Sequence, residues 1–173
     1  VLRQAFEAAW RAEGRDMSAQ QLELPSALVD AARRAATAEF PERHLVSRLE
    51  QFFDETWRYV PGAADVLAAQ DLETFGRLVD RSQAGAERAL ENQVAETVHL
   101  QRYARELGAH AASAFGAGFG GSVWALVPEA ECARFVSRWR EKYRRAHPTA
   151  GGRAQFLVTA ASVPAFEVNG RAC

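Results

Sequence analysis

The stretch that decides the fold is residues 109–127, AHAASAFGAGFGGSVWALV. Its first seven residues are small and apolar, and residues 116–121 contain four glycines. Residues 122–127 are rich in strand-forming side chains and end at Pro128. This order predicts a strand, a glycine-rich turn and a second strand, and therefore a β-hairpin.

The chain before this hairpin carries apolar residues at helical spacing. Leu2, Phe6 and Trp10 indicate a first short helix, and a second one begins at Pro25 and runs until Pro41 stops it. A long, buried helix is expected from Glu42 to Val60, where Pro61-Gly62 breaks the run.

Two further helices are expected before the hairpin. Asp71 is a suitable N-cap for one whose inner stripe would be Leu72, Phe75, Leu78 and Val79, with Arg77, Asp80 and Arg81 outward. The other runs from about Ala95 to Leu107 and is capped by Gly108.

After the hairpin, Pro128 opens the clearest amphipathic helix of the chain, which ends near His147-Pro148. We expect a turn over 149–153, a strand over 155–160, and an edge strand or tail over 164–168. The fold class is therefore α+β, with a helical first half followed by a small antiparallel sheet and a packed helix. One domain is expected over 1–173, with a helical lead-in at 1–41 and a core at 42–168.

Composition excludes several classes of protein. With 21 Lys+Arg and 22 Asp+Glu the net charge is -1, so nucleic acid is not an expected partner, and no segment approaches a membrane span. The two cysteines, Cys132 and Cys173, form neither a disulfide framework nor a paired-cysteine metal motif, which favours a cytoplasmic protein. Because the sequence starts at Val1 without a signal peptide pattern, we expect it to be cut from a longer polypeptide.

The glycine-rich turn matches the pattern G-x-G-x-x-G, which occurs in two well-known classes of nucleotide site. Dinucleotide-binding proteins need a helix after the loop, whereas residues 122–127 look like a strand. Protein kinases need a lysine on a following strand, and Lys142, the only lysine, lies in the amphipathic helix. On its own residues, the loop is either a functional loop that a ligand or neighbour approaches closely, or a sheet corner.

Three segments together resemble the C-terminal domain of a galactokinase, in the family of galacto-, homoserine, mevalonate and phosphomevalonate kinases. Residues 116–127 are similar to the family's third motif, G-x-G-F-G-G before a hydrophobic strand. Residues 71–82, DLETFGRLVDRS, resemble the galactokinase segment D-x-x-x-F-G-x-L-x-x-x-S. Residues 96–108 are similar to the helix before the glycine motif.

The resemblance also has departures. Galactokinases usually have Ser-His where this chain has Ser82-Gln83, and an arginine and a threonine where it has Ser113 and Phe115. The resemblance implies that the phosphate-binding loop, the catalytic aspartate and most sugar contacts lie in an N-terminal kinase domain that this chain lacks. The chain is then one wall of an interdomain cleft and is inactive alone.

These implications define the expected site. No catalytic residue is expected in this chain. ATP and Mg²⁺ would be held mainly by the missing N-terminal domain, and a sugar would be the other small-molecule partner. The glycine loop would line the ATP and substrate cleft through Gly116, Ala117, Gly118, Phe119, Gly120, Gly121 and Ser122.

For the remaining candidate side chains, structural or surface roles are expected. Ser82 is a weaker cleft candidate, since a serine near a helix end is more often solvated or bonded to backbone. The four histidines, His44, His99, His110 and His147, show no metal-ligand spacing. Trp57, Trp124 and Trp139 fall in apolar stripes that predict core packing.

The function predicted from the resemblance is the C-terminal part of an ATP-dependent sugar kinase, most specifically galactokinase, which makes galactose 1-phosphate and ADP. Alternatives are a kinase of this family with another sugar or small-molecule acceptor, and a non-catalytic galactokinase-like sugar sensor. A stand-alone interaction domain with only a fold-level likeness is a third.

Overall fold

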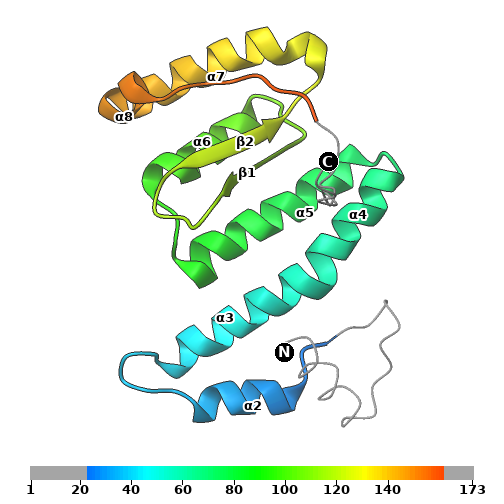
Figure 1. The fold of residues 1–173 in the computed structure, drawn as a ribbon, viewed down its shortest axis with the longest axis vertical. Coiled ribbons are helices and arrows are strands. Elements are labelled where there is room, and N and C mark those ends of the chain that lie inside the picture. The colour runs from blue at the N-terminus through cyan, green and yellow to red at the C-terminus, as the bar shows by residue number, and fades with distance from the viewer. Residues whose placement is uncertain (1–22, 162–173) are drawn as a thin grey trace, which may run out of the picture.

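The computed structural model describes residues 23–161. Helices occupy most of residues 26–106, and a two-stranded sheet and two helices follow (Figure 1). The first group is α2 (Ser26–Arg34), α3 (Glu42–Asp54), the π-helical turn η1 (Glu55–Tyr59), α4 (Val60–Ala68), α5 (Leu72–Gly85), a second π-helical turn η2 (Ala86–Leu90) and α6 (Ala95–Glu106). The second is β1 (Ala111–Phe115), β2 (Ser122–Leu126), the 3-10 turn η3 (Glu129–Glu131), α7 (Cys132–Ala146) and α8 (Pro148–Arg153). The expected α+β class is thereby confirmed.

Two helix ends follow the chemistry of their residues. The Asp71 carboxylate accepts a hydrogen bond from the Thr74 backbone N–H at 2.9 Å, which confirms it as the N-cap of α5. Hydrogen bonds from the Thr74 hydroxyl and N–H hold the pKa of Asp71 below its ordinary value. Gly108, with φ +99°, follows α6 in the left-handed region that favours glycine.

The sequence predicted that the helix starting at Glu42 ends at Pro61-Gly62. In the structure it continues past these residues. The chain passes through the π-helical turn η1 and continues as α4, with Pro61 in its first turn. At this junction the Val60 N–H donates to the Glu55 carbonyl, five residues back. A wider turn here lets the chain absorb a proline that cannot donate a backbone N–H. The preceding helix, α2, also ends earlier than expected, at Arg34, and Pro41 is the N-cap of α3.

The hairpin forms as predicted. β1 and β2 pair antiparallel, from Ala111 opposite Leu126 to Phe115 opposite Ser122. Ala111 and Ala112 are fully buried, because α5 and α6 both pack against β1. Small side chains on this strand allow that close approach.

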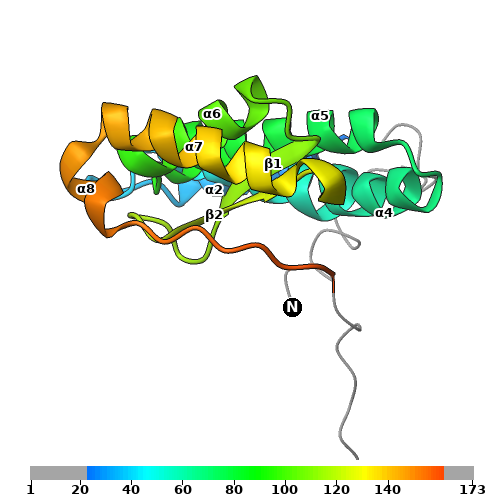
Figure 2. The same ribbon diagram turned by 90° about the horizontal axis from the view of Figure 1, so that it is seen from above.

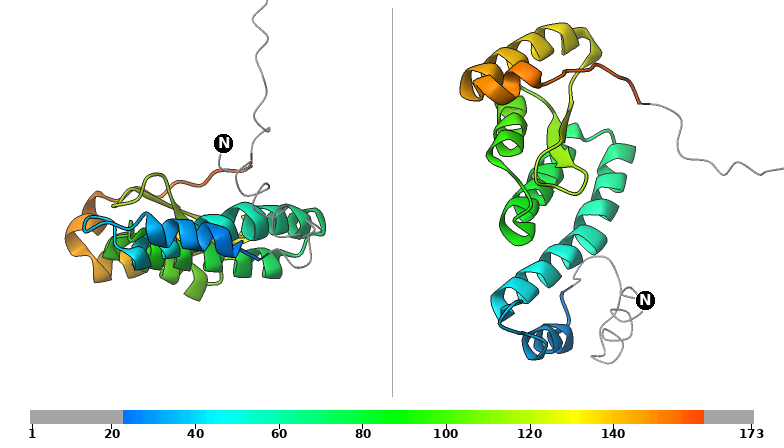
Figure 3. Two further views of the ribbon diagram at one scale, coloured as in Figure 1. Left: turned by 90° about the horizontal axis from the view of Figure 1, so that it is seen from below. Right: turned by 60° about the vertical axis from the view of Figure 1, so that its left-hand side comes forward.

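The main core lies between the hairpin, α6 and α7. Its buried residues are Ala104, Ala109, Ala112, Phe135 and Trp139. A second cluster surrounds Phe53, which is 1% exposed, and joins α3 to Leu24 and Leu28 near α2. Figure 3 shows α3 leading away from the hairpin towards α2. Trp139 is buried, and Trp57 and Trp124 are half-buried against rings, Trp57 on Phe53 and Trp124 beside Phe75.

Two expectations after α7 are wrong. Residues 149–153 lie in the short helix α8 rather than in a turn, because Pro148 suits a first helical position. Residues 155–160 form no strand; only Phe156 packs inward, on Trp139, while Leu157 and Val158 stay 84% and 62% exposed. A strand needs a paired edge, and the sheet of the described residues contains only β1 and β2. The expected helix over 2–10 and the segment 164–168 lie outside the described residues.

Asp80, expected to face outward from α5, and Lys142 of α7 both form ion pairs with residues of α6. Asp80 forms an ion pair with Arg105 of α6 at 2.8 Å, and Arg105 also donates to the His110 carbonyl. Lys142 of α7 pairs with Glu106 of α6 and lies 4.6 Å from the centre of the Tyr103 ring. These ion pairs link α6 to α5 and to α7.

Candidate functional site: the glycine loop

The hairpin presents the glycine loop, residues 116–121, at the end where Phe115 and Ser122 close the ladder. Four of its glycines have positive φ, from +89° at Gly118 to +115° at Gly120. Phe119 also has a positive φ, +58°, which is uncommon for a side chain of its size. The loop therefore adopts a backbone path that few residues other than glycine accept.

The four glycines differ in how much space surrounds them. A Cβ at Gly118 would lie 2.6 Å from Asn92 Cγ and 2.7 Å from Asn92 Cβ, and would overlap the Asn92 carbonyl oxygen. A Cβ at Gly116, Gly120 or Gly121 would meet nothing within 4 Å. Gly118 is thus required by close packing, whereas the other three leave open space that a ligand or another protein surface can enter.

Asn92 also bonds to the loop, from the connection between η2 and α6. Its backbone carbonyl accepts a hydrogen bond from the Phe119 N–H at 2.5 Å. Its side-chain amide donates to the Ala117 carbonyl at 3.3 Å. Sequence reasoning did not single out Asn92; its only signal was a residue that tolerates irregular backbone in a short link between two helical segments.

The loop is exposed on one side of the molecule. Phe119 is 75% exposed and Phe115 is 57% exposed, and Ser122 is exposed as well. Seen from above, the β2 side of the hairpin lies on one side of the layer that α5, α6 and α7 form (Figure 2). Two large aromatic side chains in solvent beside open glycines are typical of a recognition surface.

Ser82 bonds to the π-helical turn η1. Its hydroxyl donates to Glu55 Oε1 at 2.6 Å, which ties α5 to the π-helical turn η1. Within residues 23–161 no hydrogen bond links Ser82 to the glycine loop.

The two polar positions at which the chain departs from the galactokinase pattern touch each other. The Gln83 side chain is 3% exposed, and its Oε1 accepts from the Ser113 hydroxyl at 3.0 Å and from the Ala114 N–H at 2.9 Å. Its Nε2 donates to Glu87 at 3.0 Å. Gln83 therefore fixes the edge of β1 just before the glycine loop.

Two histidines pack against each other and against tyrosines near α6 and α7. The ring nitrogens of His99 and His147 lie 2.8 Å apart. His99 stacks on Tyr103, and the His147 ring is tilted against Tyr143. Burial, and then the negative charge of Glu96, raise the pKa of Tyr143 above its ordinary value. Among residues 23–161, no three side chains of His, Cys, Asp or Glu gather to hold a metal ion. Nor does any helix in that range have the length and apolar character to cross a membrane.

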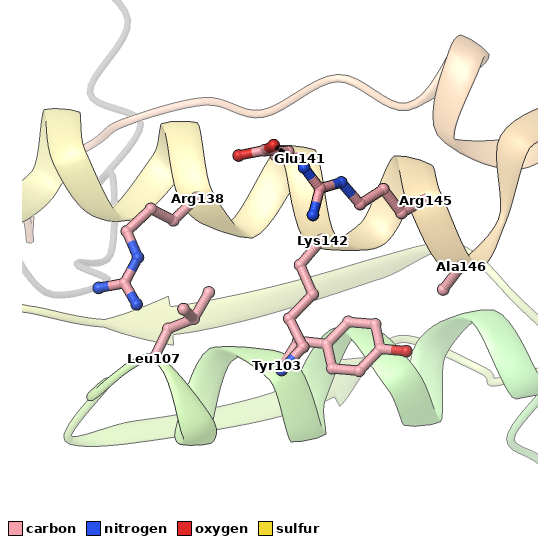
Figure 4. A pocket seen from close by; sticks show the side chains of 7 residues that line it. All are labelled: Tyr103, Leu107, Arg138, Glu141, Lys142, Arg145 and Ala146. Atoms are coloured by element: carbon pink, nitrogen blue, oxygen red, sulfur yellow. Dashed lines mark hydrogen bonds and ion pairs between the residues drawn. The ribbon is translucent and has the colours of Figure 1, made fainter.

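A shallow groove lies between α6 and α7, away from these residues (Figure 4). Tyr103, Arg138, Lys142 and Arg145 line it, and no residue of the glycine loop does. Lys142 and Arg145 are already paired with glutamates. The groove is therefore a partly neutralised helix surface, and the glycine loop remains the candidate site.

Comparison with known proteins agrees with this geometry. A family model described as "GHMP kinases C terminal" matches residues 63–145, which include α5, α6, the hairpin and most of α7. The fold is similar to the crystal structure of Lactococcus lactis galactokinase complexed with galactose, with a TM-score of 0.58 and 23% sequence identity. That similarity covers 83% of this chain and 35% of the galactokinase chain, while no curated protein sequence matches. Residues 63–145 are thus similar to the C-terminal domain of the GHMP kinases.

Proposed function

We propose that this chain is the C-terminal part of an ATP-dependent sugar kinase, most specifically a galactokinase that makes galactose 1-phosphate and ADP. The observation that carries the proposal is the glycine loop, whose positive φ angles and open glycines are held in place by Asn92. The family match over residues 63–145 and the similar fold of a galactokinase complexed with galactose support it.

Phosphoryl transfer depends on alignment of donor and acceptor and on stabilisation of charge on the phosphoryl oxygens. Backbone N–H groups supply that stabilisation without rearrangement when a rigid loop holds them. The absence of any Cβ at Gly116, Gly120 and Gly121 lets phosphate oxygens or a second loop approach such groups closely. The loop therefore fits the role of one wall of a phosphate site.

The fit to the cofactors is partial, which suits a two-domain site. The described residues offer N–H donors for ATP phosphates but no cluster of carboxylates for Mg²⁺. We assign the Mg²⁺ and most ATP contacts to an N-terminal kinase domain. When bound, Mg²⁺ would neutralise negative charge on the phosphates. This chain covers 35% of the similar galactokinase, and Phe119 and Phe115 provide apolar surface for the remainder.

A kinase of the same family with another acceptor is the second candidate. The observation in its favour is the contact between Gln83 and Ser113, because both differ from the usual galactokinase residues and they hydrogen-bond to each other. We take this paired difference beside the loop as the mark of a changed acceptor pocket. The acceptor, rather than the kinase chemistry, is the property this contact would alter.

The experiment measures ADP release from Mg-ATP by the natural polypeptide that contains this chain, with a panel of hexoses and sugar acids. The 173-residue chain is assayed beside it. Galactose-dependent turnover by the longer protein alone supports galactokinase. Turnover only with another acceptor supports the second candidate, and sugar binding without ADP release in any mixture contradicts both.

A further inference from the structure

Asn92 occupies the short link between η2 and α6, where the chain reverses direction towards the glycine loop. Glu91, just before it, has a left-handed φ of +49°, and this turn aims the Asn92 carbonyl at the Phe119 N–H. Asn92 contacts the loop at two bonds and at Gly118, the glycine whose missing Cβ makes room for it. The two bonds go to Ala117 and Phe119, on either side of Gly118. Among the described residues outside the hairpin, no other residue makes a hydrogen bond to residues 116–121.

Asn92 is itself held by Gln93, which bonds in turn to the buried Thr97. Gln93 Nε2 donates to Asn92 Oδ1 at 2.9 Å, and Gln93 Oε1 accepts from the Thr97 hydroxyl at 3.0 Å. Thr97 is 2% exposed, in the first turn of α6, and Val94 bonds its hydroxyl as well. A short relay of side chains therefore runs from the packed start of α6 to the loop.

We infer that Asn92 is the positioning residue of the glycine loop: it clamps residues 117–119 in the one conformation that exposes Phe119 and leaves Gly116, Gly120 and Gly121 open. The contribution of this clamp to phosphoryl transfer rests on the proposed function. The clamp itself does not, since its contacts lie within this chain.

The backbone of the loop explains why a clamp is needed. Five of its six residues have positive φ, and one of these is a phenylalanine, whose left-handed conformation is strained. A glycine-rich segment without outside contacts samples many conformations. Asn92 supplies the contacts that select one of them, so its loss should free the loop while the hairpin ladder survives.

The test compares amide hydrogen exchange in the 173-residue chain and its Asn92→Ala variant. Asn92→Ala keeps the backbone carbonyl that accepts from Phe119 but loses the side-chain bond to the Ala117 carbonyl. The loop should then open more often, so exchange at the Phe119 N–H should become about fivefold faster, the effect of one ordinary hydrogen bond. Exchange within β1 and β2 should not change. Gln155→Ala, at an exposed residue far along the chain, is the control for a general effect on stability. Equal exchange at Phe119 in Asn92→Ala and the parent chain would overturn the clamp.

A second pair of variants tests the same contact if Asn92→Ala does not fold. Gly118→Ala and Gly116→Ala place a Cβ at nearly equal φ, +89° and +93°, so their backbone strain is matched. Only the Cβ at Gly118 meets Asn92. Gly118→Ala should therefore accelerate exchange at Phe119 several-fold more than Gly116→Ala. Equal acceleration by the two would overturn the inference.

Activity of the natural polypeptide separates the clamp from the proposed function. A positioning role predicts that Asn92→Ala lowers kcat at least tenfold with little change in the KM for the sugar, and that Asn92→Asp, which lacks the amide donor, does not restore kcat. A wild-type protein without turnover contradicts the proposed function, and the exchange data still decide the clamp. Unchanged kcat in Asn92→Ala overturns the positioning role even if exchange accelerates.

Discussion

Gln83 provides a quantitative test of how α5 fixes the strand that leads into the glycine loop. Its buried amide oxygen accepts from Ser113 and from the Ala114 N–H. Gln83→Leu keeps much of the side-chain volume but removes both acceptor bonds. It also removes the bond from Nε2 to Glu87, whose half-buried carboxylate can bond to water instead. The Ser113 hydroxyl already lies 3.0 Å from the Ala114 carbonyl and keeps a partner, whereas the Ala114 N–H loses its bond to Gln83.

The expected magnitude follows from that one orphaned donor. A buried polar group without a partner costs about 1–3 kcal/mol, so Gln83→Leu should lower the free energy of unfolding by about 2 kcal/mol. For a chain of this length, this corresponds to a fall in Tm of about 4–8 °C. Urea denaturation at constant m-value measures the change, and amide exchange at Ala114 should accelerate with it.

A matched control makes the result specific. Gln155→Leu is the same chemical change at an exposed residue, and it should alter stability by less than about 0.5 kcal/mol. If Gln83→Leu loses no more stability than Gln155→Leu, Gln83 does not hold β1 as described.

Other variants test the fold around the site. Gly76→Ala should destabilise the protein by about 1–3 kcal/mol in urea denaturation, because a Cβ there would overlap the His110 carbonyl and force α5 away from β1. Phe53→Ala should cost about 3–5 kcal/mol by the same assay, since Phe53 is 1% exposed at the centre of the second cluster; a small loss would mean that this cluster contributes little. Since the pKa of Asp71 is depressed in the folded state, its carboxylate contributes stability above the ordinary value of 3.8 that is lost as pH falls through the folded pKa. Below about pH 4, the Tm of Asp71→Asn should therefore fall less steeply with decreasing pH than the Tm of the parent chain. Parallel plots of Tm against pH for the two proteins would contradict this assignment.

Local signals in the sequence predicted much of the fold. Asp71 and Gly108 mark helix ends by well-understood capping chemistry, and the glycine run between two β-prone segments predicted the hairpin. These features depend on residues adjacent in the chain, so no knowledge of tertiary packing was needed.

The errors share a physical origin in tertiary contacts. Pro61 looked like a stop because the π-helical turn before it, which accommodates the proline, leaves no pattern in the sequence. Residues 155–160 have strand-forming side chains, but a strand also requires a partner edge. Asp80 appeared solvated because its partner, Arg105, lies on another helix.

The candidate site was only half predictable. The glycine pattern located the loop, but which glycine is sterically required depended on the position of Asn92, an unremarked residue in a short link. The contact between Gln83 and Ser113 likewise joins residues 30 positions apart. Neither contact has a periodicity or spacing that sequence reasoning could use.

The central claim, that the open glycines of the loop serve phosphoryl transfer, is tested most directly at Gly120. A Cβ there meets nothing within 4 Å, so Gly120→Val should lower stability only through backbone strain, by about 1–3 kcal/mol. The new side chain would fill the open space and keep phosphate oxygens away from the backbone N–H groups of the loop. In the natural polypeptide we therefore predict that ADP release from Mg-ATP falls by about a hundredfold or more, as when a transition-state donor is lost, at temperatures where the variant stays folded. Unchanged turnover by folded Gly120→Val would contradict the claim.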